Sequence, residues 1–390
     1  MSAKWSLRRL LLMLRQYRLS NYNFKLIIYV FLLSLIGYFA VGSAKESVQD
    51  KQFYGIVIGL ILMVTLSLID YNLYAYIKWI IYFVNIALLI TVLFAGHEVN
   101  GSKRWINIGF QFQPSELAKI LLILFFAQFI MKYKDKMDTV RVFFSAVGLV
   151  AVPLFLVIKE PDLSTTIMIA VTFCVMIFIG GLNYRYVFIV LATIIPLGIV
   201  FFSIILQEGQ TILEGYQILR ILAWLYPEKY ADTAAYQQMN SVTAISSGML
   251  TGKGLNNNVI ASVKNGNFIS EPQTDFIYAI IGEELGFIGA VAVIVLLILI
   301  AKECLRIAKY STNLSGAIIA DAMAALIAIQ GFLNIAVATG FMPNTGIPLP
   351  FVSAGLTSLV SLYMGIGVVL NVGLQCDKRS GSTITLGQMY

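Results

Sequence analysis

The sequence predicts an all-α, polytopic membrane protein with ten transmembrane helices and a large extracellular loop between helices 7 and 8. Hydrophobic residues make up 59% of the chain and charged residues only 12%, whereas soluble domains carry roughly 25% charged residues. The mean hydropathy of +0.83 agrees with this class. Apolar runs near the ~20 residues that a helix needs to cross a bilayer complete the prediction. The predicted spans cover residues 25–43, 53–70, 74–95, 115–131, 142–158, 163–181, 185–206, 276–301, 315–338 and 352–374.

Local signals mark features of several spans. Ser115, directly after Pro114, predicts that the fourth span begins there with Ser115 as its N-cap. Pro153 predicts a kink in the fifth span. At the eighth span, Thr274 is the expected N-cap, and Asp275 falls in the first turn, where the helix dipole favours a carboxylate. This carboxylate either only caps a membrane helix or belongs to a site.

Basic residues indicate the orientation of the chain. With ten spans, the segments rich in lysine and arginine are the two tails and the connections after the fourth and eighth spans. All four fall on one side, which the positive-inside rule makes cytoplasmic. We therefore expect a cytoplasmic amphipathic segment at 1–24, a ten-helix membrane domain at 25–375 and a cytoplasmic tail at 376–390.

Four connections fall on the outer side, at residues 96–114, 159–162, 207–275 and 339–351. The third is far longer than the others, and such loops are usually functional or disordered. An apolar stripe with aromatic members predicts instead a helix that lies in the membrane interface. The stripe consists of Ile212, Leu213, Tyr216, Ile218, Leu219, Leu222, Trp224 and Leu225.

Residues that usually bind metals are scarce. The three cysteines have unrelated spacings, which gives neither a disulfide framework nor a metal signature. The single histidine, His97, cannot form a histidine-rich site. The net charge of +7 matters through its placement in the membrane topology, so no nucleic-acid partner is expected.

Unusual polar residues cluster on the outer side. Glu116 and Lys119 lie three positions apart, so they share a helix face and can pair. Lys119 lies a full turn inside the span, where an ionisable group is costly and often functional. The alternative is a lysine that snorkels beside its own glutamate. Arg104 and Trp105 are either an interfacial anchor or part of a site.

The other outer connections carry further candidates. Asp162 by itself is an ordinary helix start, and Arg220 interrupts the apolar stripe of the long loop. Residues 246–254 form a glycine- and serine-rich turn that fails the Walker pattern, although its backbone amides can hold an anion. At 100° per residue, Glu283 falls within a quadrant of Asp275 and Glu284 almost opposite. We expect Glu283 to face the site and Glu284 to pack against a polar group of a neighbouring helix.

These residues gather both signs of charge beside a lipid-facing groove. Cations stabilise phosphates and the negative charge that develops on a leaving group. A carboxylate near them can remove a proton from a hydroxyl. The residues therefore predict a lipid-phosphate substrate handled at the outer surface. The cations are Arg104, Lys119, Arg220 and Lys253, and the carboxylates are Asp275, Asp162 and Glu116.

Several long motifs follow one another along the chain. They are Asn100-Gly101-Ser102-Lys103-Arg104-Trp105, Gln113-Pro114-Ser115-Glu116 with Lys119, Glu160-Pro161-Asp162-Leu163, Tyr236-Gln237 leading to Ser247-Gly248 and Gly252-Lys253-Gly254, Glu271 to Gly286, and Thr345-Gly346-Ile347-Pro348-Leu349-Pro350-Phe351-Val352-Ser353. With these motifs, essentially the whole chain resembles the SEDS family (shape, elongation, division and sporulation), the RodA/FtsW/SpoVE peptidoglycan glycosyltransferases of bacteria.

The resemblance implies polymerisation of lipid II into glycan strands at the outer face of the cytoplasmic (inner) membrane. Asp275 would be the general base that deprotonates the acceptor hydroxyl, which then attacks the donor's anomeric carbon with inversion. Arg104, Lys119 and Arg220 would hold pyrophosphate or orient the acceptor. The remaining candidate substrate-binding residues are Trp105, Glu116, Asp162, Gln237, Ser247, Lys253, Glu283 and Ser353.

The resemblance also implies partners. A class B penicillin-binding transpeptidase is the expected protein partner, in a membrane complex that meets lipid II and membrane lipids. The resemblance does not decide whether the reaction needs a divalent cation, Mg²⁺ or Mn²⁺. The sequence itself forms no dedicated metal cage. The chain departs from the common pattern at Gln273, where many relatives have histidine, and at Ala354, where tyrosine is common.

Two other functions compete with this one. A lipid II flippase should carry polar groups near the membrane midplane and an inverted repeat. In this chain the charges gather at one face and no repeat is visible, which favours an enzyme. A scaffold that only recruits a transpeptidase would not need Asp275.

Overall fold

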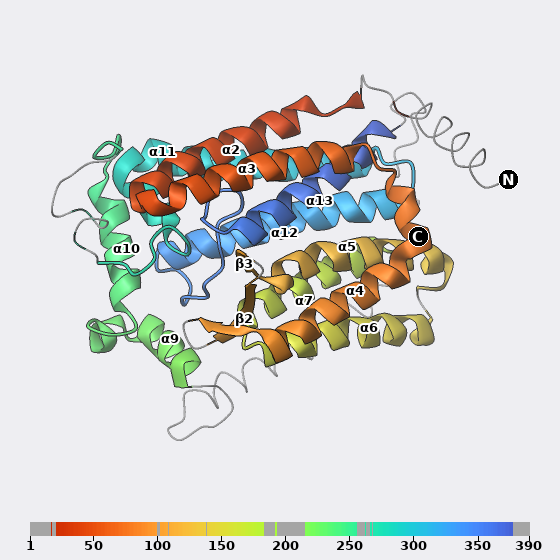
Figure 1. Cartoon of the computed structure of the whole chain (residues 1–390), viewed down its shortest axis with the longest axis horizontal. Coiled ribbons are helices and arrows are strands. Elements are labelled where there is room, and N and C mark those ends of the chain that lie inside the picture. Colours follow the sequence, from red (N-terminus) through yellow and green to blue (C-terminus); the bar gives the residue numbers. More distant parts are fainter. Residues whose placement is uncertain are drawn as a thin grey trace.

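The computed structural model describes residues 17, 21–99, 102–107, 109–137, 139–182, 192, 215–255, 262, 266 and 268–376. In this part of the chain, eight helices are long and apolar enough to cross a membrane, and the apolar α7 (Leu163–Ile179) is shorter. The helices run along the long axis of the molecule (Figure 1). The eight are α2 (Phe24–Ala44), α3 (Glu46–Ser67), α4 (Tyr74–Ala95), α5 (Pro114–Tyr133), α6 (Val140–Lys159), α11 (Ile277–Lys309), α12 (Leu314–Ala338) and α13 (Leu356–Leu374).

These helices match nine of the ten predicted spans, with corrections at their ends. The predicted seventh span, 185–206, lies outside the described residues except for residue 192, as do most of 1–24 and 376–390. Helix α5 begins one residue earlier than predicted, with Gln113 as N-cap and Pro114 in the first turn. Helix α6 continues through Pro153 without an interruption in its helical assignment.

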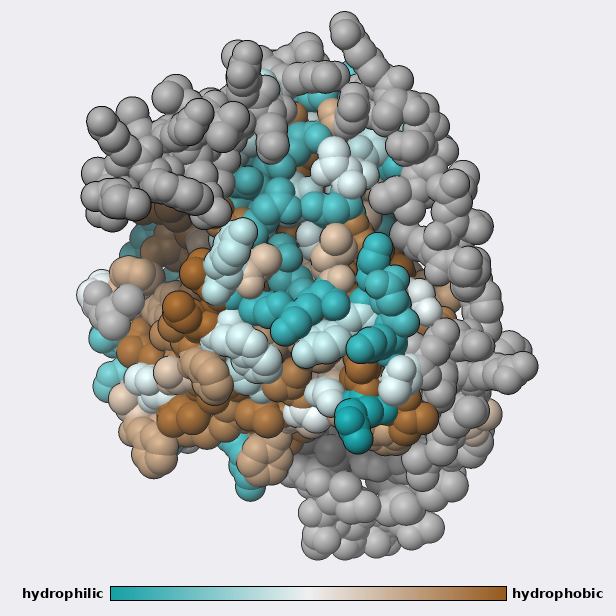
Figure 2. Space-filling view, turned by 90° about the vertical axis from the view of Figure 1, so that its right-hand side faces the viewer, coloured by the Kyte–Doolittle hydropathy of each residue, from teal (hydrophilic) through white to brown (hydrophobic). Residues whose placement is uncertain are grey.

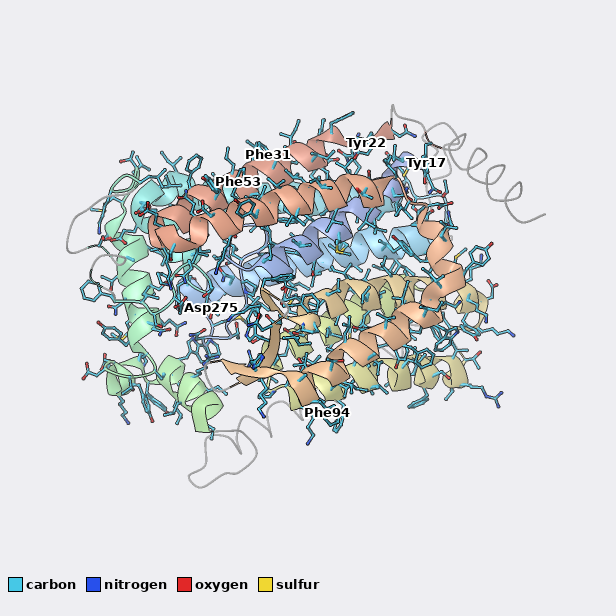
Figure 3. All side chains as sticks on the ribbon, in the orientation of Figure 1. Tyr17, Tyr22, Phe31, Phe53, Phe94 and Asp275 are labelled. Atoms are coloured by element: carbon cyan, nitrogen blue, oxygen red, sulfur yellow. The ribbon has the colours of Figure 1, made fainter. Side chains whose placement is uncertain are left out.

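Burial separates the central helices from those at the margin. In α5 and α13, 83% of the most apolar stretch is buried, compared with 22% in α6. Helix α13 packs against α3, α5, α11 and α12, which places it at the centre of the bundle. Exposed apolar side chains such as Phe31 on α2 and Phe53 on α3 project from the bundle (Figure 3). Such a surface is suited to contact with lipid.

Short elements cover one end of the bundle, which we call the Asp275 end. Strands β1 (His97–Val99), β2 (Ser102–Asn107) and β3 (Gln111–Phe112) form an antiparallel sheet between α4 and α5. Helices α9 (Gly215–Leu225) and α10 (Tyr236–Ser247) lie at the same end (Figure 1). Helix α9 confirms that the apolar stripe of the long loop is helical from residue 215 onward.

Helix α11 is broken at Gly286, which has φ +65° and ψ −162°. The turn that follows α10 enters this break. Its Lys253 and Gly254 amides donate to the carbonyls of Glu283 and Glu284, and the Phe287 amide donates back to the Met249 carbonyl. The turn therefore satisfies main-chain groups that the break removes from the helical ladder.

The opposite end of the bundle is held by a polar network. The Asn371 amide of α13 donates to the Ser67 carbonyl over 2.8 Å and accepts from the Tyr71 amide over 2.9 Å. Gln375 donates to Asp70 over 2.8 Å. Figure 2 shows this end, with hydrophilic side chains gathered between hydrophobic ones. The network ties the connection between α3 and α4 to the end of α13.

Candidate active site

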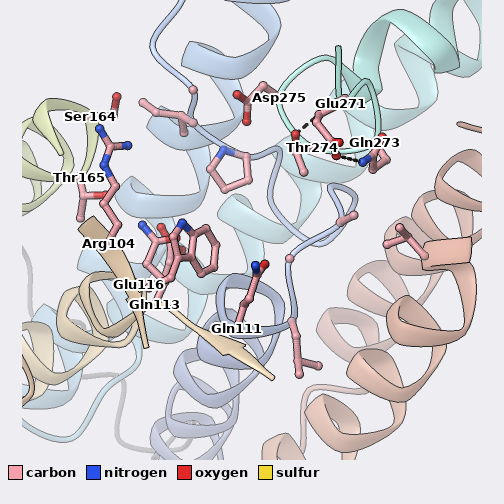
Figure 4. Close-up of a pocket in the computed structure, with 18 of the residues that line it drawn as sticks. Arg104, Gln111, Gln113, Glu116, Ser164, Thr165, Glu271, Gln273, Thr274 and Asp275 are labelled. Carbon is pink, nitrogen blue, oxygen red and sulfur yellow. Dashed lines mark hydrogen bonds between the residues drawn. The ribbon is translucent and has the colours of Figure 1, made fainter. Parts of the chain in front are cut away.

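A cavity of about 1100 Å³ opens at the Asp275 end of the bundle. Residues from all four predicted outer connections line it, because those connections meet at this end. Figure 4 shows Arg104 on one wall and Asp275 on another. The predicted site residues among its walls are Arg104, Trp105, Glu116, Lys119, Asp162, Arg220, Gln237 and Asp275.

Arg104 lies on β2, and its side chain contacts the segment between α6 and α7. Its guanidinium donates to the carbonyls of Glu160 and Pro161, and it lies 3.8 Å from the Asp162 carboxylate. Asp162 also caps α7 as predicted, accepting the Thr165 amide over 3.1 Å. Asp162 therefore has two roles: it caps the start of α7, and it helps to fix the Arg104 guanidinium in the cavity wall.

Lys119 is the second cation in the cavity wall. Its ammonium lies 2.9 Å from the Glu116 carboxylate, which confirms the predicted pair, and both side chains are buried. The ammonium also donates to the Gln330 side chain of α12 over 3.3 Å. A buried lysine held from two helices cannot extend to the membrane surface. The snorkelling alternative is therefore excluded by the geometry.

Asp275 lies in the loop before α11, which begins at Ile277 with Phe276 as its N-cap. The predicted N-cap at Thr274 is wrong, because the Thr274 amide and hydroxyl donate to the Glu271 carbonyl and close a separate turn. Asp275 is consequently not a helix cap. Its side chain lines the cavity, at the end of the bundle opposite Tyr17 and Tyr22 (Figure 3).

Two opposing influences act on the Asp275 carboxyl. Burial raises its pKa above the ordinary value, while the charges of Arg220 and Arg104 lower it and Glu271 raises it. Burial dominates, so the pKa is raised overall. A carboxylate with a raised pKa is a stronger base, which suits it to accept a proton from a hydroxyl.

The walls carry balanced charge. The cations Lys51, Arg104, Lys119 and Arg220 face the same cavity as the carboxylates Glu116, Asp162, Glu271 and Asp275. The attraction of the cavity for an anion therefore depends on where the individual cations lie, because the net charge of its walls is close to zero. Arg220 contributes from α9, where its guanidinium donates to the Asn344 carbonyl over 3.5 Å.

Glu160 lies behind the Arg104 wall and was not predicted as a site residue. Its side chain is fully buried, and neither carboxyl oxygen has a hydrogen-bond partner within the described residues. Burial, reinforced by the neighbouring Asp162 and opposed by Arg104, raises its pKa to about 8. The carboxyl is therefore mostly protonated at neutral pH.

Four predicted substrate-binding residues do not line the cavity: Ser247, Lys253, Glu283 and Ser353. Glu283 is buried and pairs with Lys253 over 2.7 Å, so its expected position facing the cavity is corrected. The helical-wheel argument assumed that Asp275 belongs to the same helix, whereas the helix begins after it. Glu284 accepts from Ser43 of α2 over 2.5 Å, which confirms its predicted contact with a neighbouring helix.

The cavity also contains polar residues that the sequence reasoning did not single out. Gln113 donates to Asp162 over 3.2 Å, and Lys51 and Gln52 reach the cavity from α3. Gln113 and Glu271 lie within motifs that carried the resemblance. Lys51 and Gln52 were passed over because the second span was expected to begin at residue 53, whereas α3 starts at Glu46.

Known proteins match the chain over most of its length. A family model for FtsW, RodA and SpoVE, described as "Cell cycle protein", matches residues 17–378. Stage V sporulation protein E of Bacillus subtilis is 34% identical over 362 residues, covering 89% of this chain and 95% of that protein. Peptidoglycan glycosyltransferase MrdB of Escherichia coli K12 is 32% identical over 352 residues, covering 87% and 91%.

Solved structures agree. A chain from "Structural coordination of polymerization and crosslinking by a peptidoglycan synthase complex" matches with a TM-score of 0.75 and 25% identity, covering 90% of this chain and 97% of that one. A mutant form of the Thermus thermophilus rod shape determining protein RodA matches with a TM-score of 0.65 at 25% identity, covering 90% and 97%. The agreement of sequence, fold and motif order places this chain in the FtsW/RodA/SpoVE family.

Proposed function

We propose that this chain is a peptidoglycan glycosyltransferase that polymerises lipid II, with Asp275 as the general base. The observation that carries the proposal is the cavity in which Asp275 faces Arg104, Lys119 and Arg220. The relatives named peptidoglycan glycosyltransferase support the reaction class. The family serves cell shape, division or sporulation, and this chain has one of these roles.

The proposed reaction is an inverting displacement. The Asp275 carboxylate takes the proton of the acceptor sugar hydroxyl as that oxygen attacks the anomeric carbon of the donor. The bond from that carbon to the lipid diphosphate breaks, and the electron pair leaves with the diphosphate. Arg104, Lys119 and Arg220 stabilise the negative charge that develops there.

The metal requirement stays a prediction. Among the described residues, no group of three or more histidine, cysteine, aspartate or glutamate side chains is arranged to hold an ion. Mg²⁺ or Mn²⁺ would therefore depend on the substrate diphosphate for part of its coordination.

We also propose the membrane setting and a partner. The chain is a multi-pass membrane protein, and its basic connections favour the inner membrane with both termini cytoplasmic. A class B penicillin-binding transpeptidase fits the polymerisation and crosslinking that the structural neighbour's complex combines.

Polymerisation of fluorescent lipid II by the purified chain, with and without a transpeptidase, tests the function. Wild-type protein should yield glycan polymer on a gel, whereas Asp275→Asn should yield at least about 10²-fold less because the base is lost. Asp321→Asn makes the same change in α12 outside the cavity walls and should retain activity.

Each other outcome has a meaning. Polymer from both wild type and Asp275→Asn would remove Asp275 as the base. Movement of lipid II across a vesicle membrane without polymer would favour the flippase. Absence of both activities, together with growth that survives Asp275→Asn, would favour the scaffold.

A further inference from the structure

The main chain around Asp275 is held at three consecutive positions. The carbonyls of Gln273, Thr274 and Asp275 each accept a hydrogen bond from a different group. The donors are the Ala354 amide, the Ser353 hydroxyl and the Asn334 side-chain amide. Helix α11 begins only at Ile277, and these three bonds hold the backbone of the loop that precedes it.

Asn334 makes the contact closest to the carboxylate. Its buried amide nitrogen, on α12, donates to the Asp275 carbonyl over 2.8 Å and to the Ile347 carbonyl over 2.7 Å. Both partners are acceptors, so the amide nitrogen and not its oxygen must face them. One side chain thus ties the loop before α11 to the connection between α12 and α13.

Ser353 adds a second anchor. Its hydroxyl donates to the Thr274 carbonyl over 2.6 Å and accepts the Leu349 amide over 2.7 Å. With its side chain buried and both bonds directed to main chain, Ser353 has a structural contact where a substrate contact was expected. It binds the same two segments that Asn334 joins.

The carboxylate itself lies against one of these segments. A Cβ added at Gly346 would stand 3.4 Å from the Asp275 Oδ2 atom, and Gly346 has φ +71°. Gly346 directly precedes Ile347, whose carbonyl Asn334 holds. Asn334 therefore fixes both the backbone that carries the carboxylate and the wall against which the carboxylate rests.

Helix α12 also holds the cation across the cavity. Gln330, one turn before Asn334, accepts from Lys119 over 3.3 Å and donates to the Pro348 carbonyl over 2.9 Å. Residues four apart lie on one helix face. The same face of α12 thus sets the positions of Lys119 and Asp275 relative to each other.

We propose that Asn334 is a positioning residue for the base Asp275, assisted by Ser353. This inference rests on the proposed function. With the backbone held at three points, only the side-chain torsions of Asp275 remain to be set, and the carboxylate meets the acceptor hydroxyl with little loss of entropy. Misplacement of a reacting group by about 1 Å can cost about 10²-fold in rate.

Steady-state kinetics of lipid II polymerisation test the role. Asn334→Ala should lower kcat by about 30- to 100-fold with KM changed less than about twofold, because substrate contacts stay in place. Ser353→Ala removes one of the three anchors and should lower kcat by about 5- to 10-fold. In both variants the acid limb of the pH–rate profile should move to lower pH, since a released carboxylate turns toward cavity water and loses part of its desolvation.

Asn85→Ala is the matched control. Asn85 on α4 is as buried as Asn334, its amide has no hydrogen-bond partner within the described residues, and it does not line the cavity. It should keep wild-type kcat and pH profile. Asn334→Ala with wild-type kcat, or a fall in kcat with an unmoved acid limb, would overturn the proposal.

Two further outcomes are separable. If Asn334→Ala does not fold, Ser353→Ala decides by the same two readouts, and wild-type behaviour of that variant overturns the proposal. If wild type polymerises lipid II and Asp275→Asn does not, yet both positioning variants behave as wild type, this inference fails while the proposed function stands. If wild-type protein makes no polymer under any condition, both fail together.

Discussion

At the scale of single residues, the chemistry depends on how far the environment of Asp275 shifts its proton affinity. Burial raises the pKa of the carboxyl, and Arg220 is the strongest influence in the opposite direction. The base works in its ionised form. Activity should therefore rise with pH through a midpoint above the ordinary aspartate value of about 3.9.

Removal of the Arg220 charge should move that midpoint further. Arg220→Gln deletes a cation that favours the ionised form, so the pKa of Asp275 rises and the acid limb should shift to higher pH. Arg220→Lys keeps the charge and should shift it less. Lys229→Gln, at an exposed position of the 3₁₀ helix after α9 that does not line the cavity, is the control. A limb that stays in place in Arg220→Gln would show that another group titrates.

At the scale of elements, the break in α11 depends on close contact between two glycines. A Cβ at Gly252 would lie 2.1 Å from the Glu284 carbonyl oxygen, and Gly252 has φ +79°. The turn enters the break only because neither Gly252 nor Gly286 has a side chain. This contact also brings Lys253 to Glu283, and so it accounts for the polar pair inside the membrane span.

Gly252→Ala should therefore displace the turn. The expected loss combines backbone strain with a steric clash, roughly 3 kcal/mol or more, which for a chain of this length is a fall of about 4 °C in the thermal unfolding midpoint in detergent. Gly254→Ala is a matched control, because φ is +90° but nothing lies within 4 Å of the added Cβ. It should cost only strain, about 1 kcal/mol. Equal midpoints for the two variants would contradict a tight fit of the turn.

At the scale of the whole molecule, the bundle separates a charged cavity at the Asp275 end from basic segments at the other. Lys132 near the end of α5 and Arg306 and Lys309 near the end of α11 lie at the end away from the cavity. Positive charge is retained on the cytoplasmic side. The cavity should consequently open toward the outside of the cell, the side on which the proposed reaction takes place.

Cysteine labelling in intact cells measures this orientation. In a cysteine-free background, Met249→Cys, at a side chain that is 80% exposed, should react with a membrane-impermeant maleimide added outside. Lys309→Cys, at an exposed position at the end of α11, should react only after the membrane is permeabilised. The reverse pattern would place the cavity on the cytoplasmic side and remove the proposed function.

The sequence by itself determined the membrane class, the nine described apolar helices, and eight of the charged and polar residues that line the cavity. Each of these follows from local information: apolar length, the side on which basic residues fall, and motifs whose order is visible without coordinates. The Glu116–Lys119 pair was also predictable, because helical spacing alone brings those side chains together. The start of α7 at Asp162 was predictable because an aspartate directly before an apolar helix is a local N-cap signal.

Only the tertiary structure decided where Asp275, Glu283 and Ser353 point. The helical wheel extended α11 back to Asp275, but bonds from Asn334 and Ser353 hold that backbone outside the helix. Glu283 pairs with Lys253 because α11 breaks at Gly286, where the turn after α10 supplies the Lys253 and Gly254 amides as donors. These outcomes depend on hydrogen bonds between residues 59 and 79 positions apart, or 30 for the ion pair. No local pattern encodes which distant carbonyl a buried donor will meet.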